Sequence, residues 1–223
     1  MLPTLGATTS ISHIVGLDGD RNLEYFRNNT SKFKTIRVTI HTTGPWPYNS
    51  PHSDNHVTTL LLLEEGGAVQ IDMRTEPDDR RGQLLWKLVG YQQSSSEIKH
   101  VDYQLAAAVE VRVLYNAIRY EWAYHQYLFS AGGSGCHYWN YSLIAKMTAS
   151  PDKFSVHADV PAHVWNLFQR WYSRTGAERV NNVLKGEFQT YAAWWNDWYS
   201  ADNEDDEDDD DDDDEDEEDD EDE

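Results

Sequence analysis

Hydrophobic and polar residues alternate along residues 35–41, Thr-Ile-Arg-Val-Thr-Ile-His, which is typical of a half-buried strand. Residues 57–63 end in four consecutive leucines and predict a central strand that is buried on both faces. Glu65-Gly66-Gly67 predicts a hairpin turn that leads into an antiparallel partner strand at 68–73. Two further strands are expected at 84–91 and 98–105.

Helical spacing of apolar residues replaces this alternation in the second half of the chain. It predicts a helix over 109–122 and another over 137–147, with Cys136 in its first turn. A third helix is expected from its cap at Asp159 to about Arg174. Shorter helical pieces are expected at 180–184 and 191–199. Strands followed by helices predict an α+β fold, in which an antiparallel sheet packs against the helix that starts at Cys136.

The charge of the chain is concentrated at one end. The protein has 40 acidic and 18 basic residues, a net charge of -22, and residues 202–223 are all acidic except Asn203. This block predicts a disordered, solubilising tail, with weak binding to basic proteins as its alternative role. Residues 1–20 are expected to be loosely ordered, because they are rich in Thr, Ser and Gly. A single domain is therefore predicted over 21–201.

Several protein classes are disfavoured by the composition. No stretch of 18 apolar residues indicates a membrane-spanning helix, and the first residues do not resemble a secretory signal. A single cysteine excludes an internal disulfide, so a cytoplasmic or nuclear location is expected. Basic residues are scattered, which argues against a nucleic-acid groove. His52, Asp54 and His56 have the ligand types that zinc prefers, but a polar loop is the favoured interpretation, so neither a metal nor a cofactor is expected.

The most informative residue is the sole cysteine. Cys136 directly follows the glycine-rich turn 132–135 and is placed where the first N–H groups and the dipole of a helix stabilise a thiolate. His56, just before the strand 57–63, is a candidate base. The alternative is that Cys136 is a small buried core residue, the commoner role of a lone cysteine.

Three blocks of the sequence carry a family resemblance. They are Asp54-Asn55-His56, residues 64–73 (Glu-Glu-Gly-Gly-Ala-Val-Gln-Ile-Asp-Met) and residues 132–139 (Gly-Gly-Ser-Gly-Cys-His-Tyr-Trp). Together they resemble an uncharacterised fungal family that is catalogued only as a domain of unknown function. The likeness covers roughly residues 36–146, and its glycine–cysteine–aromatic block is the most specific part.

More distantly, the order of these blocks resembles circularly permuted NlpC-like papain-fold proteins, including relatives of lecithin:retinol acyltransferase. In those proteins a strand-borne histidine precedes a cysteine at a helix start, and His56 and Cys136 match these two positions. Asp72, on the adjacent strand, is the first candidate for the third polar group, and Gln70 is the second. The Asn that usually precedes the cysteine in the acyltransferase group is Gly135 in this chain.

The resemblance implies nucleophilic acyl chemistry. His56 would take the thiol proton, Cys136 would attack a carbonyl carbon, and Asp72 would hold the imidazole in its productive tautomer. The predicted function is therefore a cysteine-dependent hydrolase or acyltransferase that acts on a small-molecule or peptide substrate. Residues expected to contact that substrate are Asn55, Gly133, Ser134, Trp139 and Tyr127.

The alternative function is a non-catalytic binding module of the same fold with a solubilising acidic tail. Its binding surface would be an apolar groove lined by the aromatic residues between 120 and 129. Packing beneath the glycine turn is the preferred interpretation of these residues. A thiol within about 4 Å of the His56 ring favours the enzyme, and a sulfur sealed under aromatic rings favours the binding module.

Overall fold

The computed structural model describes residues 14–17, 20–43, 55–76, 79–131 and 135–190. Residues 1–189 form one compact unit and residues 190–223 a second, and the description below concerns the first. The predicted acidic tail and the predicted helix at 191–199 lie outside the described residues.

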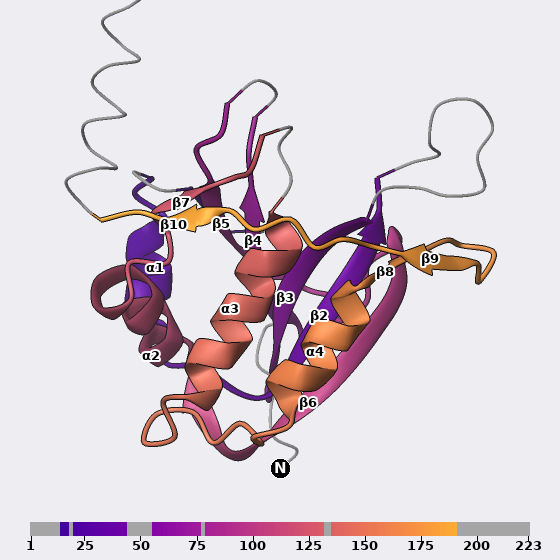
Figure 1. Cartoon of the computed structure of the whole chain (residues 1–223). Helices are drawn as coiled ribbons and strands as arrows, with labels where there is room; N and C mark the ends of the chain where they lie inside the picture. Colours follow the sequence, from indigo (N-terminus) through magenta and orange to yellow (C-terminus); the bar gives the residue numbers. More distant parts are fainter. Residues whose placement is uncertain (1–13, 18–19, 44–54, 77–78, 132–134, 191–223) are drawn as a thin grey trace, which may run out of the picture. The chain divides into compact units, whose positions relative to one another are not determined.

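The centre of the first unit is a six-stranded sheet with the order β1-β5-β4-β3-β2-β6, in which all neighbours are antiparallel (Figure 1). Its strands are β1 (Val15–Gly16), β2 (Lys32–Thr42), β3 (Asn55–Leu63), β4 (Ala68–Arg74), β5 (Gln83–Val89) and β6 (Glu97–Glu110). The predicted strands are thus confirmed, and β3 is central, with Leu61 opposite Val69 of β4. Val15 and Gly16, from the segment expected to be loosely ordered, add an edge strand beside β5.

The strand β3 is buried on both of its faces. Leu61 belongs to the main hydrophobic core, whereas Leu60 packs with Ala68 and Val89 in a separate small cluster. The turn into β4 needs glycine, because Gly67 has φ +72° and a Cβ there would lie 2.6 Å from the carbonyl oxygen of Val89.

In the described residues, the α-helices that accompany the sheet are α1 (Leu23–Arg27), α2 (Val111–Asn116), α3 (Cys136–Thr148) and α4 (Val160–Phe168). The helix α2 continues into a π-helical turn, η1 (Ala117–Glu121). In Figure 1, α3 lies against β3 and β4, and α4 lies beside α3. The α+β class and the helix that begins at Cys136 are therefore confirmed. Within the described residues, no helix has the length and apolar character needed to cross a membrane.

Short strand pairs complete the unit: β7 (Tyr127–Leu128) with β10 (Glu187–Phe188), and β8 (Arg170–Tyr172) with β9 (Glu178–Val180). The predicted extension of the third helix to Arg174 is wrong, because α4 ends at Phe168 and the next residues form β8. Gly176 has φ +82° in the turn between β8 and β9. The predicted helix at 180–184 is also wrong, since Val180 ends β9 and 181–184 has no regular structure.

Tertiary contacts explain why these residues are not helical. The backbone of Tyr172 in β8 bonds the side-chain amide of Asn55, at the start of β3. Likewise Val109 and Glu110, predicted as helical, pair with β2 as the last residues of β6. At both places, hydrogen bonds to residues far away in the sequence outweigh a weak local preference for helix.

Candidate active site

The turn before α3 places Cys136 at the first position of the helix. Gly135, which precedes it, has φ +153°, a conformation that side chains rarely adopt. A Cβ at Gly135 would also lie 2.9 Å from the Tyr127 hydroxyl oxygen. That hydroxyl donates a 3.0 Å hydrogen bond to the carbonyl oxygen of Gly135 and accepts one from the N–H of Gly186. Glycine is therefore required here, and the turn is anchored from β7.

Asn140 joins the helix of Cys136 to the strand of His56. Its side chain is fully buried, accepts a 2.7 Å hydrogen bond from the Thr59 hydroxyl, and donates to the carbonyl oxygens of Val57 (3.1 Å) and Cys136 (2.8 Å). The sequence analysis did not single out Asn140. The sequence feature that could have identified Asn140 is its position, a polar residue one helical turn after Cys136 among apolar neighbours.

His56 and Asp72 face each other where two strands separate. The β3–β4 ladder pairs Thr59 with Ile71, and no pair of that ladder is described nearer the start of β3. In this interval the His56 Nε2 lies 2.6 Å from Asp72 Oδ1. The imidazole keeps 27% of its surface exposed.

The structure brings the three predicted residues together. With Nε2 bonded to Asp72, the ring nitrogen of His56 left for another partner is Nδ1. His56 and Cys136 interact electrostatically with each other, which places the thiol near the His56 imidazole, and the residue Cys136 is half-buried. Asp72, His56 and Cys136, from β4, β3 and α3, thus form one cluster, in which the bond between His56 and Asp72 fixes the imidazole.

The electrostatics of this cluster favour a thiolate–imidazolium pair. Burial opposes the charged form of His56, but the bond to Asp72 and the interaction with Cys136 outweigh it and raise the pKa of His56 to about 10. Burial likewise raises the pKa of the Cys136 thiol, but the imidazoles of His137 and His56 lower it further, to well below its usual value. The lowered pKa favours the thiolate form that a nucleophilic cysteine needs.

A second imidazole, from His137, also contacts the thiol. His137 Nδ1 lies 3.6 Å from Cys136 Sγ, and the ring packs edge-on against Phe168 and Trp171. The sequence analysis did not assign a role to His137. The residue after a helix-start cysteine carries no signal of its own, because its orientation depends on α4 and β8.

A third histidine, His41, lies beside His56 on the neighbouring strand, with 6.4 Å between the ring centroids. Its ring nitrogens bond the hydroxyls of Ser96 (2.9 Å) and Thr58 (2.8 Å). Burial and the nearby His56 lower the pKa of His41 to about 4. His41 is therefore neutral at physiological pH, and His56 is the cation of this pair.

The described residues predicted to contact substrate are already bonded to the protein. Asn55 donates to the carbonyl oxygen of Tyr172 and accepts from its N–H, and the Trp139 indole N–H donates to Tyr124. The Tyr127 hydroxyl donates to the carbonyl oxygen of Gly135. These side chains position the site, and the predicted contacts Gly133 and Ser134 lie outside the described residues.

Strand β8 contacts the sequence neighbours of both His56 and Cys136. Tyr172 binds Asn55, which precedes His56, while Trp171 packs on His137, which follows Cys136. Among the aromatic residues of 120–129, Tyr127 and Phe129 are buried, with the Tyr127 ring against Phe129 and Phe188, whereas Tyr120 is exposed.

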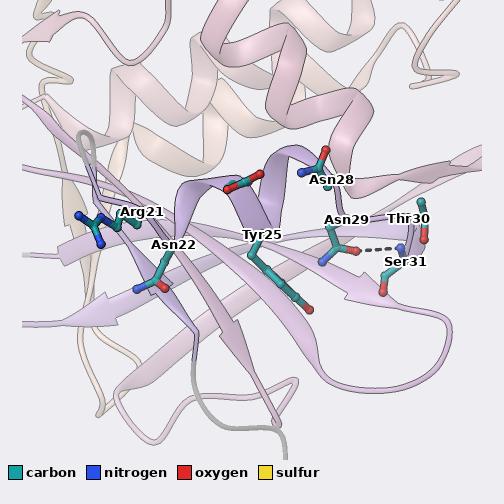
Figure 2. A pocket seen from close by; sticks show the side chains of 8 residues that line it. Arg21, Asn22, Tyr25, Asn28, Asn29, Thr30 and Ser31 are labelled. Atoms are coloured by element: carbon teal, nitrogen blue, oxygen red, sulfur yellow. Dashed lines mark hydrogen bonds between the residues drawn. The ribbon is translucent and has the colours of Figure 1, made fainter.

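In the described residues, neither a surface depression near α1 nor a group of metal ligands offers chemistry of this kind. An open depression lies at α1 and the start of β2, lined by polar side chains such as Arg21, Asn28 and Asn29 (Figure 2). It shares no residue with the Cys136 site. No cluster of three potential metal ligands occurs among the described residues, while His52 and Asp54 lie outside them.

One family model matches the chain, over residues 36–189, with the description "Domain of unknown function (DUF7770)". The chain therefore belongs to this family, as the sequence blocks predicted, and the match includes His56, Asp72 and Cys136. No curated protein and no solved structure matches the chain.

Proposed function

We propose that this member of a family of unknown function is a cysteine-dependent hydrolase or acyltransferase, with Cys136 as its nucleophile. The observation that carries the proposal is the 2.6 Å bond between His56 and Asp72 together with the electrostatic interaction of His56 with Cys136 at the start of α3. A nucleophile, a base and a group that orients the base are the parts that covalent acyl transfer needs.

The proposed reaction begins from the ionised pair. The Cys136 thiolate attacks the carbonyl carbon of an acyl donor, and the His56 imidazolium gives its proton to the leaving group, which leaves a thioester on Cys136. Neutral His56 then takes a proton from water or from an acceptor nucleophile, whose attack releases the acyl group. Asp72 keeps the Nε2–H of His56 engaged, so that Nδ1 faces the reacting atoms.

The start of α3 supplies electrostatic stabilisation in this proposal. The first N–H groups of a helix lack intrahelical acceptors, and the N–H of Cys136 is among them. This N–H can donate to the oxyanion that forms during attack. The arrangement also agrees with the NlpC-like resemblance, in which a histidine on a strand precedes a cysteine at a helix start.

We also propose a substrate class, a cellular location and a role for the acidic tail, each on the basis of the sequence. A small-molecule or peptide acyl donor suits a partly open thiol, and a single cysteine suits a cytoplasmic or nuclear location. The acidic tail is proposed to keep the protein soluble, with at most weak binding to basic proteins.

Incubation with activated acyl esters and thioesters, followed by intact-mass and peptide analysis, tests the proposal. The expected result is an acyl adduct on Cys136 that His56→Ala slows by at least about a hundredfold, as for loss of a general base. Cys136→Ala should give no adduct. A folded wild-type protein whose thiol reacts only after unfolding would contradict the proposal and leave the binding module as the function.

A further inference from the structure

His137 is a buried imidazole that the proposed mechanism does not use. Only 6% of its surface is exposed, and its Nδ1 lies 3.6 Å from Cys136 Sγ. Its other nitrogen, Nε2, is buried without a hydrogen-bond partner among the described residues. The centroids of Phe168 and Trp171 lie 5.1 Å and 5.2 Å from that of the imidazole, with both rings nearly perpendicular to it.

These contacts favour one tautomer. A neutral imidazole carries one N–H and one lone pair, whereas an imidazolium carries two N–H groups, and in His137 the second of these, on Nε2, would be buried without an acceptor. With the proton on Nδ1, the N–H of His137 has an acceptor, the sulfur of Cys136. With the proton on Nε2, a buried N–H would lack an acceptor and a lone pair would face an electron-rich thiolate, which is the costlier arrangement.

We infer that His137 is a positioning residue that donates a hydrogen bond from a neutral Nδ1–H to the Cys136 thiolate. The inference rests on the proposed function, in which that thiolate is the nucleophile. The two imidazoles at the sulfur then have different roles. His56 takes and returns a proton during the reaction, whereas His137 moves no proton and stabilises the thiolate at pH values below the ordinary range of a thiol.

Two amide variants separate a fixed donor from a merely structural ring. In His137→Asn the side-chain NH₂ can occupy the position of Nδ1, while in His137→Gln the amide extends toward the position of Nε2. Neither amide carries a proton to or from the sulfur. The readout is the rate of iodoacetamide alkylation of the full chain at pH 6 and pH 9, with folding checked by near-UV circular dichroism.

The expected result is that His137→Gln reacts about tenfold more slowly than wild type at pH 6, the loss of one hydrogen bond to a charged group. At pH 9 its rate should fall within about twofold of wild type, because the free thiol ionises there. His137→Asn should stay within about threefold of wild type at pH 6. Equal rates for His137→Gln and wild type at pH 6, or an equal loss in both variants, would overturn the inference.

A spectroscopic measurement keeps the test decisive if either variant fails to fold. Long-range ¹H–¹⁵N spectra of the wild-type chain report the protonation of each imidazole nitrogen. His137 should show a neutral Nδ1–H ring at pH 7, and a charged ring or a neutral Nε2–H ring would refute the inference. Failure of the proposed function looks different, since His56→Ala would then leave the alkylation rate at pH 6 unchanged whatever the state of His137.

Discussion

At the scale of single residues, His56 is the charged member of a buried polar cluster. Asp72 bonds one of its nitrogens and Cys136 is its second partner, while the neighbouring His41 stays neutral because its pKa falls to about 4. The two histidines and the thiol of Cys136 are thereby coupled in their ionisation. This coupling favours one cation, on His56, and one thiolate, on Cys136, near neutral pH.

The coupling predicts an unusual pH profile for alkylation. Because the pKa of His56 is raised to about 10 and that of Cys136 is lowered, the pair stays ionised between these two values, and wild-type rates at pH 6 and pH 8 should agree within about threefold. An ordinary thiol with a pKa of about 8.5 would react roughly 80-fold more slowly at pH 6 than at pH 8.

Asp72→Asn should weaken this coupling, since it removes the carboxylate that holds the imidazolium. The ratio of alkylation rates at pH 6 and pH 8 should fall toward that of an ordinary thiol. Asp102→Asn is the matched control, because Asp102 pairs with Arg37 across β2 and β6 and touches no residue of the site in the described structure. The same loss in both variants would contradict the assignment of Asp72.

Asn140 and Cys136 should differ in their contributions to stability. Asn140→Ala removes three hydrogen bonds and leaves the Thr59 hydroxyl and the Val57 carbonyl buried, which is expected to cost about 2–4 kcal/mol. Cys136→Ala should change the free energy of unfolding by less than about 1 kcal/mol, since it also removes a charge from a partly buried site. Urea denaturation of both variants measures this, and equal losses would indicate a structural cysteine.

At the scale of secondary structure elements, the site depends on how α3 begins. The turn at Gly135 combines a positive φ with close contact to the rings of Tyr127 and Phe129. The helix is then bonded to β3 through Asn140. The position of the thiol is therefore fixed from β7 on one side and from β3 on the other.

Gly135→Ala should disturb this turn directly. A methyl group 2.9 Å from the Tyr127 hydroxyl oxygen, at a φ of +153°, is expected to cost about 1–3 kcal/mol and to slow alkylation of Cys136. Gly90→Ala is the control, because Gly90 has no positive φ and its Cβ would meet nothing within 4 Å. Thermal unfolding and alkylation rates of the two variants make the comparison, and matching results would refute the role of the turn.

The elements that sequence patterns predicted are those whose residues follow a clear alternation or helical spacing. Alternation and the Gly66-Gly67 turn identified β2 to β5, and helical spacing identified α3. Strand β8 was missed because its residues suit a helix and become a strand only through pairing with β9 and with Asn55. Cys136, His56 and Asp72 were identified from residue type and order, whereas His41 and His137 gain their roles from contacts made only in the folded chain.

At the scale of the whole molecule, the chain combines a nearly neutral body with a block of like charges. Of the 40 acidic residues, 21 lie in 202–223, where they repel one another and contribute no apolar surface. The buried core described here lies entirely before that block.

Deletion of residues 202–223 should therefore leave the thermal midpoint nearly unchanged, within about 2 °C, while lowering solubility near neutral pH because most of the net charge is lost. Differential scanning calorimetry and concentration at precipitation measure the two effects. A fall of many degrees would show that the tail stabilises the folded part.

The contacts of β8 with both sides of the site also limit how the chain length can vary between members of the family. Trp171 and Tyr172 are consecutive, yet one touches the neighbour of Cys136 and the other the neighbour of His56. Trp171 makes its contact through its ring and Tyr172 through its backbone, so inserting a single residue between Phe168 and Trp171 would turn the ring away from His137 and shift the backbone groups that bond Asn55. Insertions and deletions in related sequences should therefore be confined to the turn at 173–177, and the spacing from α4 to Tyr172 should stay constant.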